Sequence, residues 1–104
     1  MLNIDNLKNL CQEKNIAITK HARNRLADRG ITINDIQNAI RTGEIIKQYE
    51  NDKPFPSCLI LGSANQNKFI HVVVSSDNQF LYIITAYFPD ENEWETGLKI
   101  RKGQ

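Results

Sequence analysis

The stretch GEIIKQYE, residues 43 to 50, marks the point at which the hydrophobic pattern of the chain changes its period. Before Gly43, apolar residues recur every three to four positions, which is typical of helices with one buried face. After Gly43, short runs rich in Ile, Val, Tyr and Phe are separated by polar turns, which is typical of strands. The sequence of 104 residues therefore predicts a single α+β domain, residues 1–104, with helices first and a sheet second.

Three helices are expected, within residues 3–15, 19–29 and 33–42. Thr19 is expected to cap the second helix and Asn34 the third, because a side-chain oxygen can accept a hydrogen bond from the free N–H groups of a first turn. Gly30 and Gly43 are expected to end these two helices, since a glycine often follows the last turn.

Four strands are expected in the segments 44–50, 58–62, 68–76 and 80–88. The turns between the last three are short, so the sequence predicts a four-stranded, mostly antiparallel sheet. The second and third helices are expected to cover one face of that sheet and to leave the other face open. The tail beyond residue 89 is expected either to dock through Trp94, Leu98 and Ile100 or to fray.

Composition and charge exclude several classes of protein. The N-terminus has no apolar stretch typical of a signal peptide, and no apolar run is long enough to span a membrane, so a cytoplasmic protein is expected. Cys11 and Cys58 are 47 positions apart and are expected to be reduced and buried. The net charge of +1 does not indicate a nucleic-acid binder by itself, although bases gather in residues 14–29 and acids in residues 90–95.

One helical stripe carries residues that can do chemistry. His21, Arg25 and Arg29 lie four residues apart, so they share one side of the expected second helix. Lys20 and Arg23 add positive charge nearby, although Arg23 is also compatible with a simple solvated position. Together these side chains predict a basic surface at the margin of the core, where a phosphate can be bound.

Three further candidates lie on the expected third and fourth strands. His71 interrupts the apolar run FIHVVV, and Thr85 and Tyr87 follow on the neighbouring strand. A three-residue turn at 77–79 would place His71 opposite Thr85 and would put all three side chains on one sheet face, and a β-bulge would have the same effect. A two- or four-residue turn would separate them.

The segment HARNRLADRGI, residues 21–31, resembles the H-A-x-x-R-[ML]-x-x-R-x-I opening of the bacterial "domain of unknown function 4258" family. GEII, DKPFPSCLILG, HVVV and ITAYFP continue the resemblance in order, so that it covers roughly residues 18–89 and leaves the N-terminal helix and the C-terminal tail outside. That family is similar to RelE-like and BrnT-like toxins, small ribonucleases of bacterial toxin–antitoxin pairs. The resemblance implies a RelE-like arrangement of helices on an antiparallel sheet, RNA bound across the sheet, and a cognate antitoxin protein as partner.

The same resemblance implies roles for individual residues. His21, Arg25 and His71 are the matching catalytic candidates, with Thr85 and Tyr87 in support. Phe88 departs from the polar or basic residue often found there, so a phosphate contact made at that position elsewhere is missing here.

The chemistry expected of these residues is metal-independent cleavage of RNA, which needs a base, an acid and a cation near the phosphate. His71 or His21 is expected to transfer protons, Arg25 to hold the phosphate and Tyr87 to position the substrate, while Lys20, Arg23, Arg29 and Thr85 are expected to bind RNA. The residues alone leave open which histidine is the base. No cofactor and no metal ion is required.

Two other functions fit the sequence. A non-catalytic protein-interaction module of the same fold is one, because fold does not dictate function. The segment LADRGITINDIQNAI, residues 26–40, is also compatible with a helix-turn-helix that binds DNA, although its second helix carries little basic charge.

Overall fold

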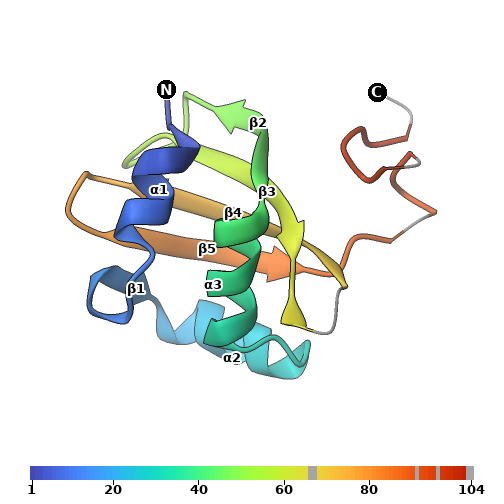
Figure 1. The fold of residues 1–104 in the computed structure, drawn as a ribbon, viewed down its shortest axis with the longest axis horizontal. Helices are drawn as coiled ribbons and strands as arrows, with labels where there is room; N and C mark the ends of the chain where they lie inside the picture. The colour runs from blue at the N-terminus through green and yellow to red at the C-terminus, as the bar shows by residue number, and fades with distance from the viewer. Residues whose placement is uncertain (66–67, 91, 96, 103–104) are drawn as a thin grey trace.

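The computed structural model describes residues 1–65, 68–90, 92–95 and 97–102. In chain order the elements are α1 (Ile4–Leu10), the 3-10 turn η1 (Glu13–Asn15), β1 (Ile16–Ile18), α2 (Lys20–Asp28), α3 (Ile33–Thr42), β2 (Glu44–Tyr49), β3 (Ser57–Ser63), β4 (Phe69–Ser76) and β5 (Leu81–Tyr87) (Figure 1). Within these residues the fold is α+β, with three α-helices and one five-stranded sheet.

The strand order in the sheet is β1-β5-β4-β3-β2. The four strands expected from the sequence run antiparallel to one another, and β1 adds a fifth, edge strand that pairs in parallel with β5. The four predicted antiparallel strands are therefore confirmed, and the additional parallel strand β1 makes the sheet five-stranded and mixed. No local pattern predicted β1, because Ile16–Ile18 is too short to show a period and its strand character depends on pairing with β5.

The helix ends follow local hydrogen bonding. Thr19 caps α2, as expected, by accepting a hydrogen bond from the N–H of Ala22, and Gly30 follows the helix with φ +70°. The N-cap of α3 is Thr32 and not Asn34. The hydroxyl of Thr32 accepts from the N–H of Asp35, and the carboxylate of Asp35 accepts from the N–H of Thr32. This reciprocal pair satisfies two N–H groups at once, which a cap at Asn34 would not do.

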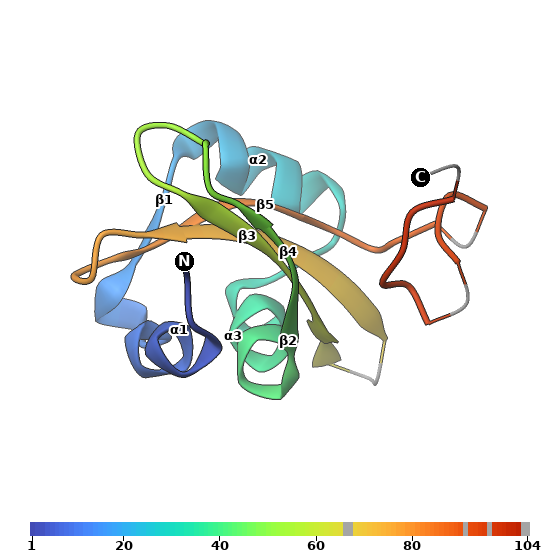
Figure 2. The same ribbon diagram turned by 90° about the horizontal axis from the view of Figure 1, so that it is seen from above.

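The helices lie on different sides of the sheet. Helix α3 packs on β3 and β4, and α1 lies beside it on the same face, whereas α2 packs along β5 (Figure 2). The expectation that α2 and α3 cover one face is wrong for α2. Strand β1 takes the outer edge of β5 immediately before α2 begins, so the chain leaves the sheet at that edge and α2 stays there.

The core lies between α1, α3 and one face of the sheet, and Leu26 of α2 also belongs to it. Its fully buried side chains include Ile36, Ile40, Ile60 and Val72. Helix α3 approaches β3 so closely that a Cβ atom built on Gly62 would lie 2.0 Å from the backbone oxygen of Ala39. No helix in the described part of the chain is long and apolar enough to cross a membrane.

Candidate functional site

A β-bulge aligns the polar residues of β4 and β5. The pairing changes register between Val73 and Val74, so that Val73 pairs with Thr85 and His71 with Tyr87, with Ile84 as the additional residue on β5. The side chains of His71, Thr85 and Tyr87 consequently share the sheet face opposite α3. The predicted common face is confirmed, although it results from a bulge and the residue opposite His71 is Tyr87, not Thr85.

The imidazole of His71 is fully buried and both of its nitrogen atoms have partners. Nε2 lies 2.8 Å from the carbonyl oxygen of Leu98, and Nδ1 lies 3.3 Å from the hydroxyl of Tyr87. Because a carbonyl oxygen can only accept, Nε2 carries the hydrogen and Nδ1 accepts from Tyr87. Burial lowers the pKa of His71, and the Leu98 carbonyl opposes this only in part, so the ring is held neutral.

The C-terminal tail covers His71. The ring of Trp94 meets the imidazole edge-on, with 4.3 Å between the ring centroids, and Leu98 supplies the carbonyl partner. A backbone bridge between Trp94 and Arg101 closes the tail on itself, and the ammonium of Lys99 lies 2.6 Å from the carboxylate of Glu44 in β2. The expectation of a docked tail is confirmed for Trp94 and Leu98. The sheet face expected to be open is therefore partly covered.

Arg29 connects α2 to the same sheet face. Its Nη1 donates to the hydroxyl of Thr85 at 3.0 Å and to the backbone oxygen of Ala86 at 2.8 Å. Only Nη1 of the guanidinium has a hydrogen-bond partner among the described residues, so its other N–H groups remain able to bind an anion. Burial raises the pKa of Tyr87, which lies two residues from Thr85, and the charges of Arg101 and Arg29 act against that rise.

The remaining basic residues of α2 lie away from this cluster. His21 and Arg25 are exposed, and neither has a hydrogen-bond or ion-pair partner within the described segments. Lys20 and Arg23 are also exposed. The structure therefore brings Arg29, Thr85, Tyr87 and His71 together. Arg25 and His21 lie about one and two turns away from Arg29, toward the N-terminus of α2.

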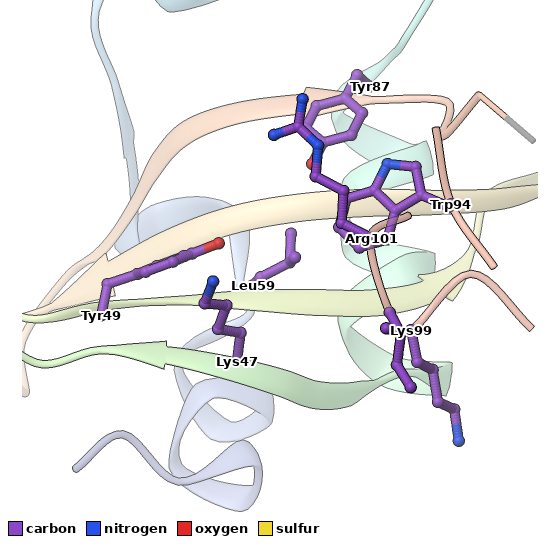
Figure 3. A pocket seen from close by; sticks show the side chains of 8 residues that line it. Lys47, Tyr49, Leu59, Tyr87, Trp94, Lys99 and Arg101 are labelled. Carbon is purple, nitrogen blue, oxygen red and sulfur yellow. The ribbon is translucent and has the colours of Figure 1, made fainter. Parts of the chain in front are cut away.

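A pocket of about 270 Å³ lies beside Tyr87, between the sheet and the tail. Lys47 and Tyr49 of β2 lie on one side of it and Trp94 and Arg101 of the tail on the other, with Leu59 between them (Figure 3). Reasoning from the sequence missed these pocket residues. The alternation of Lys47 and Tyr49 along a half-polar strand was the available signal for two of them, whereas the expected docking of the tail through Trp94 did not indicate where on the sheet it docks.

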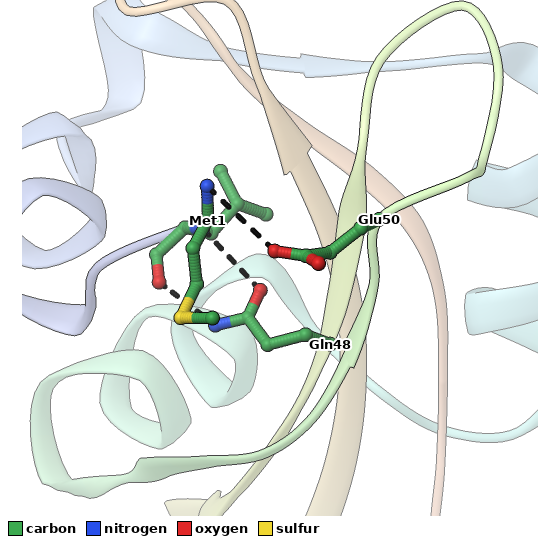
Figure 4. Close-up of polar contacts among 4 residues, drawn as sticks. Met1, Gln48 and Glu50 are labelled. Carbon is green, nitrogen blue, oxygen red and sulfur yellow. Dashed lines mark hydrogen bonds and ion pairs between the residues drawn. The ribbon is translucent and has the colours of Figure 1, made fainter.

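The alternation along β2 also fixes which of its side chains face the pocket. Gln48 points to the opposite side of β2 from Lys47 and Tyr49. There its amide donates to the backbone oxygen of Leu2 at 2.8 Å and accepts from the N–H of Leu2 at 3.3 Å, while the N-terminal amine lies 3.9 Å from Glu50 (Figure 4). The N-terminal segment thus contacts the face of β2 opposite the pocket, whereas Lys47 and Tyr49 face the pocket.

Comparison with known proteins identifies the family. The family described as "Domain of unknown function (DUF4258)" matches residues 18–88, and the chain belongs to it. Neither the curated proteins nor the solved structures contain a match to the chain. Residues 18–88 include all four clustered residues, Arg29, His71, Thr85 and Tyr87, but not the tail that covers His71. In the described segments, no group of three or more His, Cys, Asp or Glu side chains is placed to hold a metal ion.

Proposed function

We propose that the chain is the toxin of a bacterial toxin–antitoxin pair, with a RelE-like fold, and that it cleaves RNA without a metal ion on the sheet face that carries Tyr87 and His71. The observation that carries the proposal is the hydrogen bond between the hydroxyl of Tyr87 and Nδ1 of His71, with the guanidinium of Arg29 at the neighbouring Thr85. The Tyr87–His71 pair can supply the base and Arg29 the cation that this reaction requires, and the third group, the acid, can be a water molecule.

The direction of the hydrogen bond defines a proton path. Tyr87 donates to the neutral ring of His71, so Tyr87 can accept the proton of an RNA 2′-hydroxyl while passing its own proton to Nδ1. The 2′-oxygen then bonds to phosphorus, the bond from phosphorus to the 5′-oxygen breaks, and that oxygen takes a proton from solvent. The products are a 2′,3′-cyclic phosphate and a 5′-hydroxyl. Arg29, with Arg25 further along α2, balances the charge that develops on the phosphate.

In this scheme Tyr87 contacts the substrate and His71 acts through it. Tyr87 is half-buried and lines the pocket, whereas His71 is fully buried behind it. This differs from the expectation that a histidine transfers protons directly. His21 has no part in the path, because it lies on the exposed side of α2.

A non-catalytic interaction module is the second candidate. It is favoured by one observation, the full burial of His71 with both ring nitrogens engaged, because such a histidine can also be a structural link between the sheet and the tail. A DNA-binding helix-turn-helix has less support. Ile36, Ala39 and Ile40 bury one side of α3 against the sheet, and α2 packs separately on β5.

The test is cleavage of labelled RNA by the purified protein in EDTA. Fragments that end in a 2′,3′-cyclic phosphate, formed about 100- to 10,000-fold more slowly by His71→Ala, would support the ribonuclease. Lys14→Ala is the control, because Lys14 is an exposed cation on η1 outside the cluster, and it should retain cleavage. Intact RNA at high concentrations of well-folded protein, with no partner bound, would favour the interaction module.

A further inference from the structure

The pocket beside Tyr87 combines aromatic rings with positive charge. Tyr49, Tyr87 and Trp94 are the rings, and Lys47, Lys99 and Arg101 are the cations. Among the residues that the structure describes, no acidic side chain lines it. Rings of this kind stack on nucleobases, and Arg and Lys bind phosphate, so the lining matches the two halves of a nucleotide.

Two of the three cations are available to a ligand. The ammonium of Lys99 is engaged by Glu44 at 2.6 Å, whereas neither Lys47 nor Arg101 has a carboxylate within ion-pair distance in the described part of the chain. The ammonium of Lys47 lies 5.5 Å from the centre of the Tyr49 ring, which keeps a cation beside an aromatic wall.

Arg101 lies within electrostatic reach of both tyrosines. Its charge acts to lower the pKa of Tyr49 and of Tyr87, against the larger effect of burial, which raises both. The negative charge of Asp52 raises the pKa of Tyr49, and that of Glu93 raises the pKa of Tyr87, but neither Asp52 nor Glu93 lines the pocket. A phosphate placed at Arg101 would therefore be bordered by both rings.

The size of the pocket limits the ligand. Its volume of about 270 Å³ is just below the range of about 300–1,000 Å³ that is usual for small-molecule sites. It can accept one unpaired nucleotide and is too small for a base pair.

From this arrangement we infer that the pocket is a subsite for a single nucleotide of an RNA strand, with the base against Tyr49 and Trp94 and a phosphate at Arg101. The assignment to RNA rests on the proposed function. The subsite deepens that proposal, because Tyr87 borders the pocket and also hydrogen bonds to His71, so a nucleotide bound there is next to the proposed point of cleavage. Trp94 and Arg101 lie outside the segment matched by the family, so this chain's own tail completes the subsite.

Binding can be measured without cleavage, because Trp94 is the one tryptophan of the sequence and it lines the pocket. The full-length protein is titrated with AMP, adenosine, ribose 5-phosphate and a 2′-O-methyl RNA oligonucleotide, which cannot be cleaved at the blocked 2′-oxygen. The fluorescence of Trp94 is expected to change with AMP and with the oligonucleotide. AMP is expected to bind at least about tenfold more tightly than either of its two fragments.

Variants separate the two halves of the subsite. Arg101→Gln should weaken AMP about 10- to 100-fold and leave adenosine unchanged, because it removes the phosphate contact. Tyr49→Leu should weaken AMP and adenosine alike, by about tenfold, because it removes a stacking surface. Lys14→Ala is the matched control, since Lys14 is an exposed cation on η1, and it should bind like the wild type.

Several outcomes would overturn the inference. The first is that the fluorescence of Trp94 in the folded protein stays unchanged up to millimolar AMP. The second is that ribose 5-phosphate binds as tightly as AMP. The third is that Arg101→Gln binds AMP with wild-type affinity. An oligonucleotide that binds no more tightly than AMP would assign the pocket to a free nucleotide and overturn the RNA assignment.

The two proposals can fail separately. If the protein binds the oligonucleotide but does not cleave natural RNA, the nucleotide subsite is supported and the proposed ribonuclease activity is rejected. If Arg101→Gln cleaves RNA at the wild-type rate and AMP causes no change in fluorescence, only the nucleotide subsite is rejected.

Discussion

The hydroxyl of Tyr87 lies 3.3 Å from Nδ1 of His71, across two strands whose alignment depends on one additional residue, Ile84. Without the bulge, the register that holds from Leu81 to Ile83 would place Ala86 opposite His71 and would turn Tyr87 to the other face. The Leu98 carbonyl fixes the hydrogen of His71 on Nε2, and the ring therefore presents an acceptor to Tyr87. The bulge and the tail together determine the state of this pair.

Removal of the Tyr87 hydroxyl tests the proposed proton path. Tyr87→Phe is expected to slow RNA cleavage by about 100- to 10,000-fold, because the 2′-hydroxyl loses its contact with His71. Tyr82→Phe is the matched control. Tyr82 lies on the same strand, and its hydroxyl donates to Asp77 at 2.6 Å, away from His71. Single-turnover rates in EDTA measure both, and a Tyr87→Phe variant that cleaves at the wild-type rate would rule the path out.

Substitution of the two arginines by lysine separates their roles. Arg29→Lys is expected to lower the free energy of unfolding by about 1 kcal/mol, because an ammonium does not reproduce both hydrogen bonds of Nη1 to β5. It should also slow cleavage. Arg25→Lys should slow cleavage with no change in stability, since Arg25 contacts no described partner. Urea unfolding and cleavage rates measure the two effects. Equal losses of stability in both variants would contradict a structural role for Arg29 that Arg25 lacks.

The stability of the protein is expected to depend on pH through His71. Burial holds the pKa of His71 below 6.5 in the folded state, whereas the unfolded chain titrates at about 6.5, so the unfolded state binds more protons between the two values. The stabilising effect is therefore complete above pH 6.5 and is lost as the pH falls through the folded pKa. The pKa values of the Asp35 and Asp77 carboxyls are also lowered, but protonation of these groups changes the stability only below about pH 4.

The measurement is urea unfolding between pH 7.5 and about pH 5. His71→Gln should remove most of the slope, because its amide can still donate to the Leu98 carbonyl but does not titrate. His21→Gln is the control and should keep the slope, since that side chain is exposed. A wild-type slope in His71→Gln would show that other groups cause it.

The contact between α3 and β3 predicts a strong response to a single methyl group. Gly62→Ala would place its Cβ within 3 Å of three backbone atoms of Ala39, so the helix and the strand would have to separate, and a loss of about 3 kcal/mol or more is expected. Gly30→Ala meets nothing within 4 Å and has only its positive φ to accommodate, which should cost about 1 kcal/mol. Thermal or urea unfolding gives both values, and a smaller loss for Gly62→Ala would contradict the close packing.

The sequence alone determined much of this protein. The change of period at Gly43 correctly divided α2 and α3 from the strands β2 to β5, although β1 lies before it, and the Thr19 cap and the glycine after α2 were also identified correctly. These features depend on residues close together in the chain, whose hydrogen bonds and buried faces follow from local pattern. His71, Thr85 and Tyr87 also drew attention, because polar residues inside apolar strands are unusual.

The tertiary structure decided the rest. The pairing of β1 with β5, the position of α2 along the sheet edge and the bulge at Ile84 all arise from contacts between distant segments. The clearest case is the tail. Trp94 and Leu98 cover His71 because the sheet face offers an apolar surface and an imidazole N–H in need of an acceptor. A local pattern holds no information about a surface that exists only after β4 and β5 have paired, so the burial of His71 and the pocket beside it could be seen only in the folded chain.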